Sequence, residues 1–515
     1  MVAHSSILVM VIYIAFTILI SYLVNKKSSN SGDFSTGGKQ FGWLTVGISI
    51  LATYISAMTF VGMPGWVYSD GMKAIAIHLN YPIVIFFAVV FFIPVFYKLG
   101  LTSIYEYLEH RFGVITRTIN SLVFIVVQCI SSGIILYAVS LILIRVLPIS
   151  IEEAIIYISL FTAIYTFAGG ISTVIWTDVM QSAFLLVGCI AIFVTLLMNI
   201  PELGTLPELS SKLTMANLST SFSDDTTLMA GLIAVSFLHL SVYGSNQLII
   251  QRTLATKSVE TAQRSMLVCG YGAFFIYLFF SVIGVLLFIF YGGEQFENSN
   301  NVILDFVFNH THPIIVGLVM ASLSAAAMST LDSSYNSMAT VATFDIYKRF
   351  FKKEASNAHY EKTARLLSIA CAIFVIVPAM LAVSNESVLK SIASLTSIFV
   401  GIRLGSFLLG LFSRKANEIG IIAGSITSIL AILVCFNSNV AWPWFAPAGT
   451  VAFVATGLLV SQFKGEVTTE QHAFIQKQKT LYSAPTVSQY MLLVFAAFTV
   501  ASCFYLPTLL ANVLN

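Results

Sequence analysis

Residues 321–347 read ASLSAAAMSTLDSSYNSMATVATFDIY, and this stretch decides which kind of protein the chain encodes. A hydroxyl side chain occurs at nearly every helical turn, and Asp332 lies in the middle of a segment that is long and apolar enough to cross a bilayer. Close helix packing would explain the small residues and the hydroxyls. It does not explain the carboxylate, which costs about 2.5–3.5 kcal/mol on membrane-insertion scales and therefore indicates a function.

The composition of the whole chain agrees with a membrane location. Of 515 residues, 57% are hydrophobic and 9% are charged, whereas soluble proteins carry about 25% charged residues. The net charge of +2 and six scattered cysteines without a CxxC pair argue against a nucleic-acid binder and a disulfide-stabilised secreted protein. We therefore predict an all-α polytopic membrane protein. Its expected partners are the lipid bilayer, ions and small molecules, with no nucleic acid and no obligate protein partner evident.

The chain contains about fourteen apolar segments that are each long enough to cross a membrane as a helix. They lie at approximately 6–25, 42–70, 72–98, 113–146, 151–168, 171–199, 229–251, 257–292, 314–345, 361–384, 386–413, 416–437, 444–462 and 488–512. The polar gaps between them are too short to form a separate soluble domain.

The basic residues predict the orientation of these segments. With the N-terminus outside, twenty of the 25 Lys and Arg residues fall in cytoplasmic loops, four fall on the opposite side, and Arg403 lies within a segment. Cytoplasmic loops of membrane proteins are enriched in Lys and Arg. We therefore predict a multi-pass protein of the cell membrane, either plasma or bacterial inner membrane, with the N-terminus outside.

Oxygen-bearing side chains share one face of the segment that contains Asp332. Residues spaced i, i+3, i+4 and i+7 lie on one side of a helix, and here they are Ser329, Asp332, Ser333 and Asn336. The segment at 42–68, GWLTVGISILATYISAMTFVGMPGWVY, also carries hydroxyls, and its GMPG sequence predicts a helix break at Gly62–Gly65. Interrupted helices expose carbonyl oxygens that coordinate sodium in the middle of the membrane. The residues alone therefore predict an ion-coupled transporter.

Three other classes of membrane protein fit the sequence less well. A channel needs a continuous polar pore face in several helices, whereas the polarity here is confined to mid-membrane. A membrane sensor needs an appended signalling domain, for which the polar gaps are too short. The sequence contains no P-loop, HExxH or GxSxG motif, so we expect no catalytic residues and no enzyme activity.

Six stretches resemble the sodium/solute symporter family and follow the order found in that family. They are SAMTFVGMPGWVY (56–68), PVFYKLGLTSIYEYLEHRFG (94–113), FAGGISTVIWTDVMQ (167–181), NQLIIQRTLATKS (246–258), STLDSSYNSMATVATFDIYKR (329–349) and GSFLLGLFSRKAN (405–417). The similarity runs over nearly all of residues 42–413. It implies a leucine-transporter-type fold with two inverted five-helix repeats, and Na+ as the coupling ion.

The resemblance also implies how the chain is divided. Each repeat is expected to open with an interrupted helix. The expected parts are an extra N-terminal transmembrane helix with a cytoplasmic loop (1–41), the first inverted repeat (42–199), an extracellular loop (200–228), the second inverted repeat (229–413) and three additional C-terminal transmembrane helices (414–515).

Carried over residue by residue, the resemblance implies two places for sodium. The conserved site falls on the carbonyls of Ala52, Ile55 and Ala326 and the hydroxyls of Ser329 and Thr330. A second site, present in some members, falls on Asp178, Ser329, Asp332 and Ser333. The relatives have a hydroxyl residue where this chain has Asp332, so this carboxylate could strengthen the second site, carry a proton or pair with a base.

The substrate cavity implied by the resemblance lies between the repeats, near mid-membrane. Its walls are expected to include Ser56, Thr59, His78, Ser131, His239 and Ser394. Sugar-transporting relatives have a lysine where this chain has Ala273, and sialic-acid transporters have an arginine in place of Ser131, so neither signature is intact. Each of the two histidines fits equally well as a core residue that is bonded to a neighbouring carbonyl.

Arg403 fits three roles: a structural ion pair, a part of the inner vestibule, or a charge partner for an anionic substrate. Arg252 and Asp345 are expected near cytoplasmic helix ends, in gate or packing roles. The preferred function is a sodium-coupled symporter that imports a small polar organic solute by alternating access, with an organic anion such as a monocarboxylate favoured. The alternative solute is a sugar, a polyol or a sialic acid.

Overall fold

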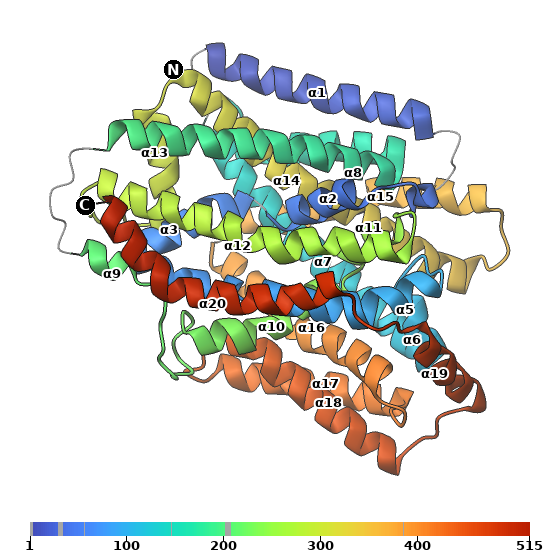
Figure 1. Cartoon of the computed structure of the whole chain (residues 1–515). Coiled ribbons are helices and arrows are strands. Elements are labelled where there is room, and N and C mark those ends of the chain that lie inside the picture. The colour runs from blue at the N-terminus through green and yellow to red at the C-terminus, as the bar shows by residue number, and fades with distance from the viewer. Residues whose placement is uncertain are drawn as a thin grey trace.

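The computed structural model describes residues 4–28, 34–55, 57–145, 147–200, 208–384 and 386–514, and these residues form helices (Figure 1). The helices are α1 (His4–Ser28), α2 (Trp43–Tyr54), α3 (Ala57–Asp70), α4 (Tyr81–Phe87), α5 (Ile93–Lys98), α6 (Tyr105–Arg111), α7 (Val114–Leu143), α8 (Ile151–Asn199), α9 (Leu209–Leu213), α10 (Val235–Ser245), α11 (Gln247–Leu254), α12 (Val259–Phe290), α13 (Val302–His310), α14 (Pro313–Val341), α15 (Asn357–Ser384), α16 (Glu386–Phe412), α17 (Glu418–Phe436), α18 (Phe445–Phe463), α19 (Thr469–Leu481) and α20 (Val487–Leu514). Short 3₁₀-helical segments (Gly37–Lys39, Met72–His78, Ser299–Asn301 and Trp442–Trp444) and π-helical segments (Ala88–Phe92, Ala230–Ala234 and Ala342–Phe351) extend or join them.

Ten helical stretches of the described chain are long and apolar enough to cross a membrane, and two bent pairs raise the number to twelve. Two of the fourteen predicted segments are joined in α8, where Gly170 departs from helical geometry (φ 58°). As one straight helix, the 49 residues of α8 would be about 74 Å long, more than twice the hydrocarbon core of a bilayer. The remaining predicted segment is α16. In Figure 1 the start of α1 and the end of α20 lie at the same end of the bundle, as an even number of crossings requires.

Two of the helices that cross the bundle are interrupted. The pair α2 and α3 is bent by 56°, and Ile55 at the break is extended (φ −80°, ψ 90°). The pair α10 and α11 is bent by 42° at Asn246, whose side chain accepts a hydrogen bond from the Leu248 amide and caps α11. The interruptions lie in the segments expected to open each repeat, while the repeat boundaries themselves stay a prediction.

The predicted break at Gly62–Gly65 is wrong, because α3 continues through Pro64. The glycine at 65 permits close packing instead of a bend. A Cβ atom on Gly65 would lie 2.7 Å from the Ser299 carbonyl oxygen, and a Cβ atom on Gly284 would lie 2.7 Å from the Pro64 carbonyl oxygen. The motif therefore brings α3 into contact with α12 and with the loop that follows it.

Gly65→Ala is expected to lower the stability of the folded protein by about 1–3 kcal/mol, the usual cost of overpacking. The added methyl group would meet backbone atoms, which cannot move aside. Gly62→Ala is the matched control in the same helix, because its nearest contact would be the Asn300 side chain at 3.9 Å. Thermal unfolding in detergent compares the two variants, and equal melting temperatures would contradict the packing argument.

The hydroxyl-rich helix α14 occupies the interior of the bundle. Every residue from Val319 to Val341 is buried. It packs against α8, α1, α7 and α15, which surround it on several sides. The polar face predicted around Asp332 is therefore enclosed by protein and does not face lipid.

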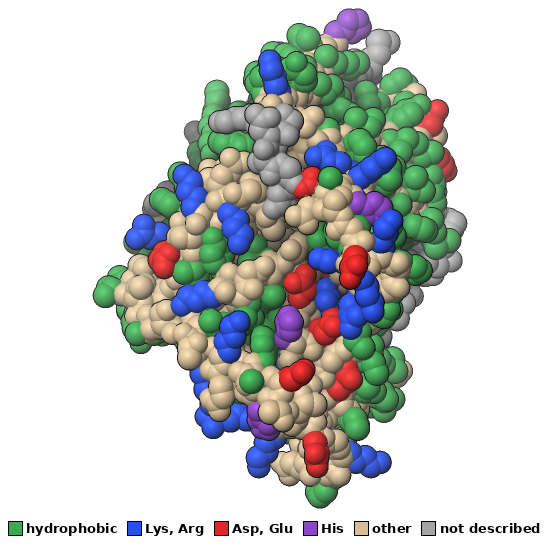
Figure 2. Space-filling view, turned by 90° about the vertical axis from the view of Figure 1, so that its right-hand side faces the viewer, with side chains coloured by type: hydrophobic (Ala, Val, Ile, Leu, Met, Phe, Trp, Pro, Cys, Tyr) green, Lys and Arg blue, Asp and Glu red, His purple; other side chains and the backbone are tan. Residues whose placement is uncertain are grey.

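Charged side chains gather at one end of the bundle. Figure 2 views the end where α19 lies, and Lys and Arg side chains gather there together with several acidic ones. On α19 itself, Lys477 and Lys479 are exposed. Cytoplasmic loops of membrane proteins are enriched in Lys and Arg, so this is the end that we expect to face the cytoplasm.

Candidate substrate and cation sites

The residues predicted for the conserved sodium site lie where α14 passes the broken end of α2. The Thr330 hydroxyl donates to the carbonyl oxygen of Thr53 at 3.1 Å and to that of Ala326 at 3.3 Å. A cavity of about 470 Å³ between α2, α8, α12 and α14 is lined by Ala52, Ile55, Ala326 and Ser329, among other residues. The structure therefore brings all five predicted residues to one place.

The chemistry of this place suits a sodium ion. Because α2 ends at Tyr54, the carbonyl groups of its last turn are not all used inside the helix. The hydroxyls of Ser329 and Thr330 are buried beside them. Unwound backbone carbonyls coordinate sodium in other transporters with broken helices, and an ion held here would link α2 to α14.

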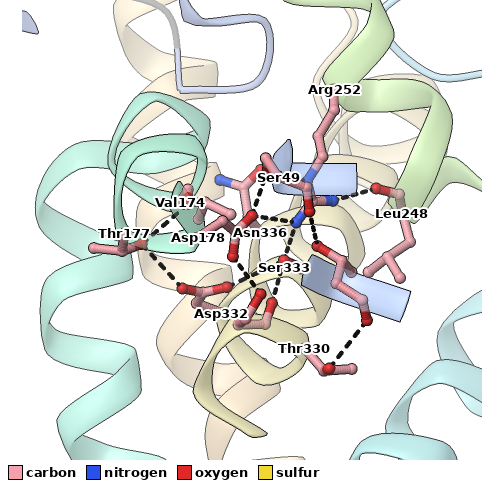
Figure 3. Close-up of polar contacts among 12 residues, drawn as sticks. Ser49, Val174, Thr177, Asp178, Leu248, Arg252, Thr330, Asp332, Ser333 and Asn336 are labelled. Carbon is pink, nitrogen blue, oxygen red and sulfur yellow. Dashed lines mark hydrogen bonds and ion pairs between the residues drawn. The ribbon is translucent and has the colours of Figure 1, made fainter. Parts of the chain in front are cut away.

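Asp178 lies at the centre of a buried polar cluster (Figure 3). Ser49 donates to Asp178 Oδ2 and Ser329 donates to Asp178 Oδ1, each at 2.5 Å. The Arg252 Nη2 atom lies 3.1 Å from Oδ2, and the two side chains are 1% and 0% exposed. Ser329 therefore connects the predicted sodium site directly to a buried ion pair.

Asp332 accepts hydrogen bonds from hydroxyl groups. Tyr165 and Thr177 donate to its Oδ2 atom at 2.9 and 3.3 Å, and Ser333 donates to its Oδ1 atom at 3.1 Å. The Asp332 side chain is fully buried. The residues predicted for a second sodium site thus form one cluster, while their role in binding sodium stays a prediction.

Arg252 is the cluster member whose role the sequence analysis missed. Beyond Asp178, its guanidinium donates to the Ser49 hydroxyl at 2.8 Å, to the Leu248 carbonyl oxygen at 2.5 Å and to the Ser333 hydroxyl. The predicted segment ended at residue 251, whereas the chain continues after the break as α11 and carries Arg252 into the interior. One sequence signal could have drawn attention to Arg252, because the residue lies in the family-like stretch at 246–258.

Arg403, the predicted candidate for a charge partner, lies elsewhere. Its Nε atom donates to the hydroxyl of Ser241 on α10 at 2.8 Å. Among the described residues it takes part in none of the ion pairs. The basic partner of the buried Asp178 carboxylate is therefore Arg252. Arg403, which was a candidate for pairing with an anion, is bonded to a neutral serine instead.

Two of the predicted substrate residues meet at a second cavity. Thr59 and His78 line a space of about 390 Å³ together with Trp66, Tyr277 and Asn300, among others. The His78 ring stacks on the Tyr277 ring, with centroids 3.3 Å apart and planes inclined by 9°. The cavity thus combines aromatic faces with amide and hydroxyl groups.

The other predicted substrate residues lie apart from this cavity or outside the described part. His239 is bonded through Nδ1 to the Asn80 side-chain oxygen at 2.6 Å, and its ring centroid lies 6.1 Å from that of His78. Ser131 is on α7 and is not among the described residues that line the cavity. Ser56 and the side chain of Ser394 fall outside the described residues.

Asp345 belongs to a network near the end of α14. Its Oδ1 atom lies 2.7 Å from Arg117 Nε, while Arg117 Nη1 lies 2.7 Å from Glu109 Oε2 and Arg349 Nη2 lies 2.9 Å from Glu109 Oε1. Burial raises the pKa of Glu109, but the hydrogen bonds from Arg117 and Arg349 outweigh burial and hold its pKa below the ordinary value. The network joins α6 and α7 to the end of α14.

A model of the sodium:solute symporter family matches residues 34–428 of this chain. The chain belongs to the sodium:solute symporter family. The sodium/sialic acid symporter SiaT of Proteus mirabilis (strain HI4320) is 31% identical to it over 465 residues, which cover 87% of this chain and 93% of the relative. The expectation drawn from the six sequence stretches is therefore confirmed.

Solved structures place this family member among sodium-coupled transporters. A Na+-coupled sialic acid symporter in a substrate-bound outward-open state has a TM-score of 0.84 and 28% identity, and the match covers 90% of this chain and 99% of that structure. Mhp1, a nucleobase-cation-symport-1 family transporter, matches with a TM-score of 0.55 and 14% identity, over 90% of this chain and 98% of its own. The second match concerns the fold alone.

These findings establish the coarse function of this symporter family member. It is an all-α multi-pass membrane protein with a leucine-transporter-type fold, and Na+ is its coupling ion. Its relatives are transporters and not enzymes. We expect this ion to bind where hydroxyl groups of α14 meet backbone carbonyl groups at the end of α2, and that location stays a prediction.

Proposed function

We propose that this symporter imports a sialic acid or a similar polyhydroxylated solute together with sodium, by alternating access. The observation that carries the proposal is the similarity to sodium/sialic acid symporters along nearly the whole chain, in sequence and in fold. This is the alternative solute of the sequence analysis, and it is now better supported than the monocarboxylate favoured there.

The cavity lined by Thr59 and His78 supports a ring-shaped, hydroxylated solute. The faces of Trp66 and Tyr277 are apolar surfaces against which a sugar ring can pack, and Asn300 and Thr59 supply hydrogen-bonding groups for hydroxyls. None of the described residues that line this cavity is an acidic or basic side chain apart from the histidine. A carboxylate on the solute would therefore be held here by neutral donors.

The prediction of a monocarboxylate as the solute depended partly on Arg403 as a charge partner. Arg403 donates to Ser241 and does not line the cavity among the described residues. A small monocarboxylate has few groups besides its charge with which to bind, so it gains least from aromatic faces and amides. The geometry of this region thus supports the sugar-like solute.

His78→Ala is expected to weaken the binding of the transported solute about 10-fold or more, corresponding to about 1.5 kcal/mol. The variant loses both a stacked ring and a hydrogen-bonding nitrogen at the cavity wall. Sodium binding without solute should stay unchanged. His472→Ala is the control, because His472 is exposed on α19. Unchanged solute affinity in His78→Ala would remove His78 from the substrate site.

The proposal is tested by a thermal-shift screen of the purified protein. Sialic acids, neutral sugars, polyols, monocarboxylates and amino acids are compared in sodium and in potassium at equal ionic strength. A bound ligand raises the apparent stability by mass action. Stabilisation by N-acetylneuraminic acid or a neutral sugar in sodium is expected, and stabilisation by monocarboxylates alone would contradict the proposed solute.

We also infer that the protein lies in the cell membrane with its N-terminus outside and α19 on the cytoplasmic side. A cysteine introduced in place of the exposed Lys477 should escape a membrane-impermeant thiol reagent in intact cells and react after permeabilisation. The parent for this variant needs its own partly exposed cysteines, Cys129 and Cys435, replaced. Labelling in intact cells would reverse the orientation.

A further inference from the structure

The cavity of about 470 Å³ between α2, α8, α12 and α14 reaches the outer surface of the bundle. Its lining includes Leu186 and Ile190 of α8 and Phe275 of α12, and all three side chains are exposed. Apolar side chains that are exposed on a membrane-spanning helix face the hydrocarbon of the bilayer. The cavity therefore opens toward lipid between α8 and α12.

This opening lies near the middle of the membrane. The lining residues of α8 fall at 181–190, in the centre of the part that follows the bend at Gly170, and those of α12 fall at 275–280, near the centre of that helix. Phe193 of α8 packs against Phe279 of α12, with ring centroids 5.3 Å apart, and joins the two helices beside the opening. Acyl chains, and not lipid headgroups, occupy this depth of a bilayer.

The lining of the cavity is unsuited to water. Fourteen of the seventeen described lining residues are apolar, and none is charged. The hydroxyls of Ser182 and Ser329 already donate to Asp178, and the amide nitrogen of Gln181 donates to Tyr13. A buried water molecule needs two to four polar partners. Most of this space therefore offers a water molecule too few hydrogen bonds.

An empty cavity of this size would also be unfavourable, because the atoms that line it would lose dispersion contacts. Apolar cavities stay dry and take up apolar molecules, and the volume lies within the range of about 300–1,000 Å³ that is usual for sites of small organic ligands. The apolar material next to the opening is the bilayer itself. A flexible acyl chain can bend sideways into an opening at mid-membrane, whereas the fused rings of a sterol cannot.

We propose that an acyl chain of a bilayer phospholipid enters between α8 and α12 and occupies this cavity. The site continues the lipid-facing surface of the two helices inward, so the chain extends an existing contact between protein and bilayer. Its inner end lies beside Ala52 and Ala326, where hydrocarbon would form the bilayer-side wall of the region expected to hold sodium. The proposal rests on the membrane location of the protein and not on the identity of the transported solute.

The test is photolabelling of the purified full chain in phosphatidylcholine vesicles that contain a phosphatidylcholine with a diazirine at the end of one acyl chain. Adducts are located by mass spectrometry of the digested protein. Cys189 and Ala326 line the cavity and are buried, while Ile192 is a buried residue of α8 that does not line it. Labelling at Cys189 and Ala326 is expected to exceed that at Ile192 about 10-fold, because close packing excludes the chain elsewhere.

Leu197 is the positive control for contact with lipid, because it is exposed on the same helix. Efficient labelling of Leu197 with no adduct at Cys189 or Ala326 would overturn the proposal. A second arm uses a sterol that carries a diazirine on its ring system. The sterol should label exposed positions alone, and labelling of Cys189 and Ala326 by the sterol but not by the acyl chain would contradict the proposed occupant.

Cys189→Phe places a ring in the cavity and should lower the labelling of Ala326 several-fold while leaving that of Leu197 unchanged. Val187→Phe is the matched control, because it adds a ring to an exposed position of the same helix that does not line the cavity. Equal labelling of Ala326 in the two folded variants would overturn the proposal. If Cys189→Phe is not recovered in folded form, the wild-type labelling pattern decides alone.

Discussion

Thr330→Ala and Ser329→Ala are each expected to weaken sodium binding about 10- to 100-fold, because a contact with a charged group contributes about 1.5–3 kcal/mol. Thr330 bonds the end of α2 and a carbonyl of α14 at once, and Ser329 lines the neighbouring cavity. Either substitution removes a buried hydroxyl oxygen from the place where sodium is expected. Because binding linkage is reciprocal, the affinity for the solute should also lose its sensitivity to sodium.

The measurement is the sodium concentration that gives half-maximal thermal stabilisation, with potassium holding the ionic strength constant. Thr450→Ala and Ser140→Ala are matched controls, since each removes a buried hydroxyl whose only bond within the described part of the chain is to the carbonyl one turn earlier. The controls should keep the wild-type sodium dependence. Wild-type sodium dependence in both site variants would remove the site from the region between α2 and α14.

Asp178→Ala is expected to destabilise the protein by about 3–5 kcal/mol, the cost of leaving one partner of a buried ion pair without the other. Arg252 would keep its charge in a place that is 1% exposed. The hydroxyls of Ser49 and Ser329 would lose their acceptor as well. This is the largest single effect on stability expected for the cluster.

The test is the midpoint of denaturant-induced unfolding in detergent micelles. Asp224→Ala is the control, because Asp224 lies in a partly exposed loop and is hydrogen-bonded to Asn217 and Thr226, and it forms no ion pair with the residues that the structure describes. Its effect should be smaller than that of Asp178→Ala, because Asp224 is partly exposed and its removal leaves no buried charge without a partner. Equal effects of the two substitutions would show that the buried pair is not important for stability.

The polar face of α14 could be predicted because two independent signals coincide there. A carboxylate in an apolar segment is costly, and the spacing of Ser329, Asp332 and Ser333 follows the helical period. The structure encloses all three residues. The hydroxyl donors that reach Asp332 from α8, Tyr165 and Thr177, gave no signal, because ordinary packing residues have the same appearance in sequence.

The helix break was misplaced for a physical reason. Glycine and proline at 62–65 are typical of a bend, but the same residues also permit close approach of two backbones. In this structure Gly65 and Pro64 pack closely against α12 and the loop after it, and the helix continues through them. Such tertiary contacts do not appear in the local sequence.

The partners of Arg252 could not be predicted, because its position follows the end of an apolar run, and its expected gate or packing role stays a prediction. A count of basic residues assigns such an arginine to the cytoplasmic side. The bend at Asn246 instead brings α11 against α14, where Gln251 donates to Asn336 and Arg252 reaches Asp178. The substrate cavity was likewise predicted only in part, since Trp66, Tyr277 and Asn300 come from separate segments.

The most direct test of sodium-coupled transport is accumulation in proteoliposomes of the solute that the thermal-shift screen selects. An inward sodium gradient is compared with an equal potassium gradient. We expect uphill accumulation with sodium alone, its collapse on addition of a sodium ionophore, and its loss in Thr330→Ala. Uptake that only equilibrates, at the same rate in sodium and in potassium, would contradict sodium coupling.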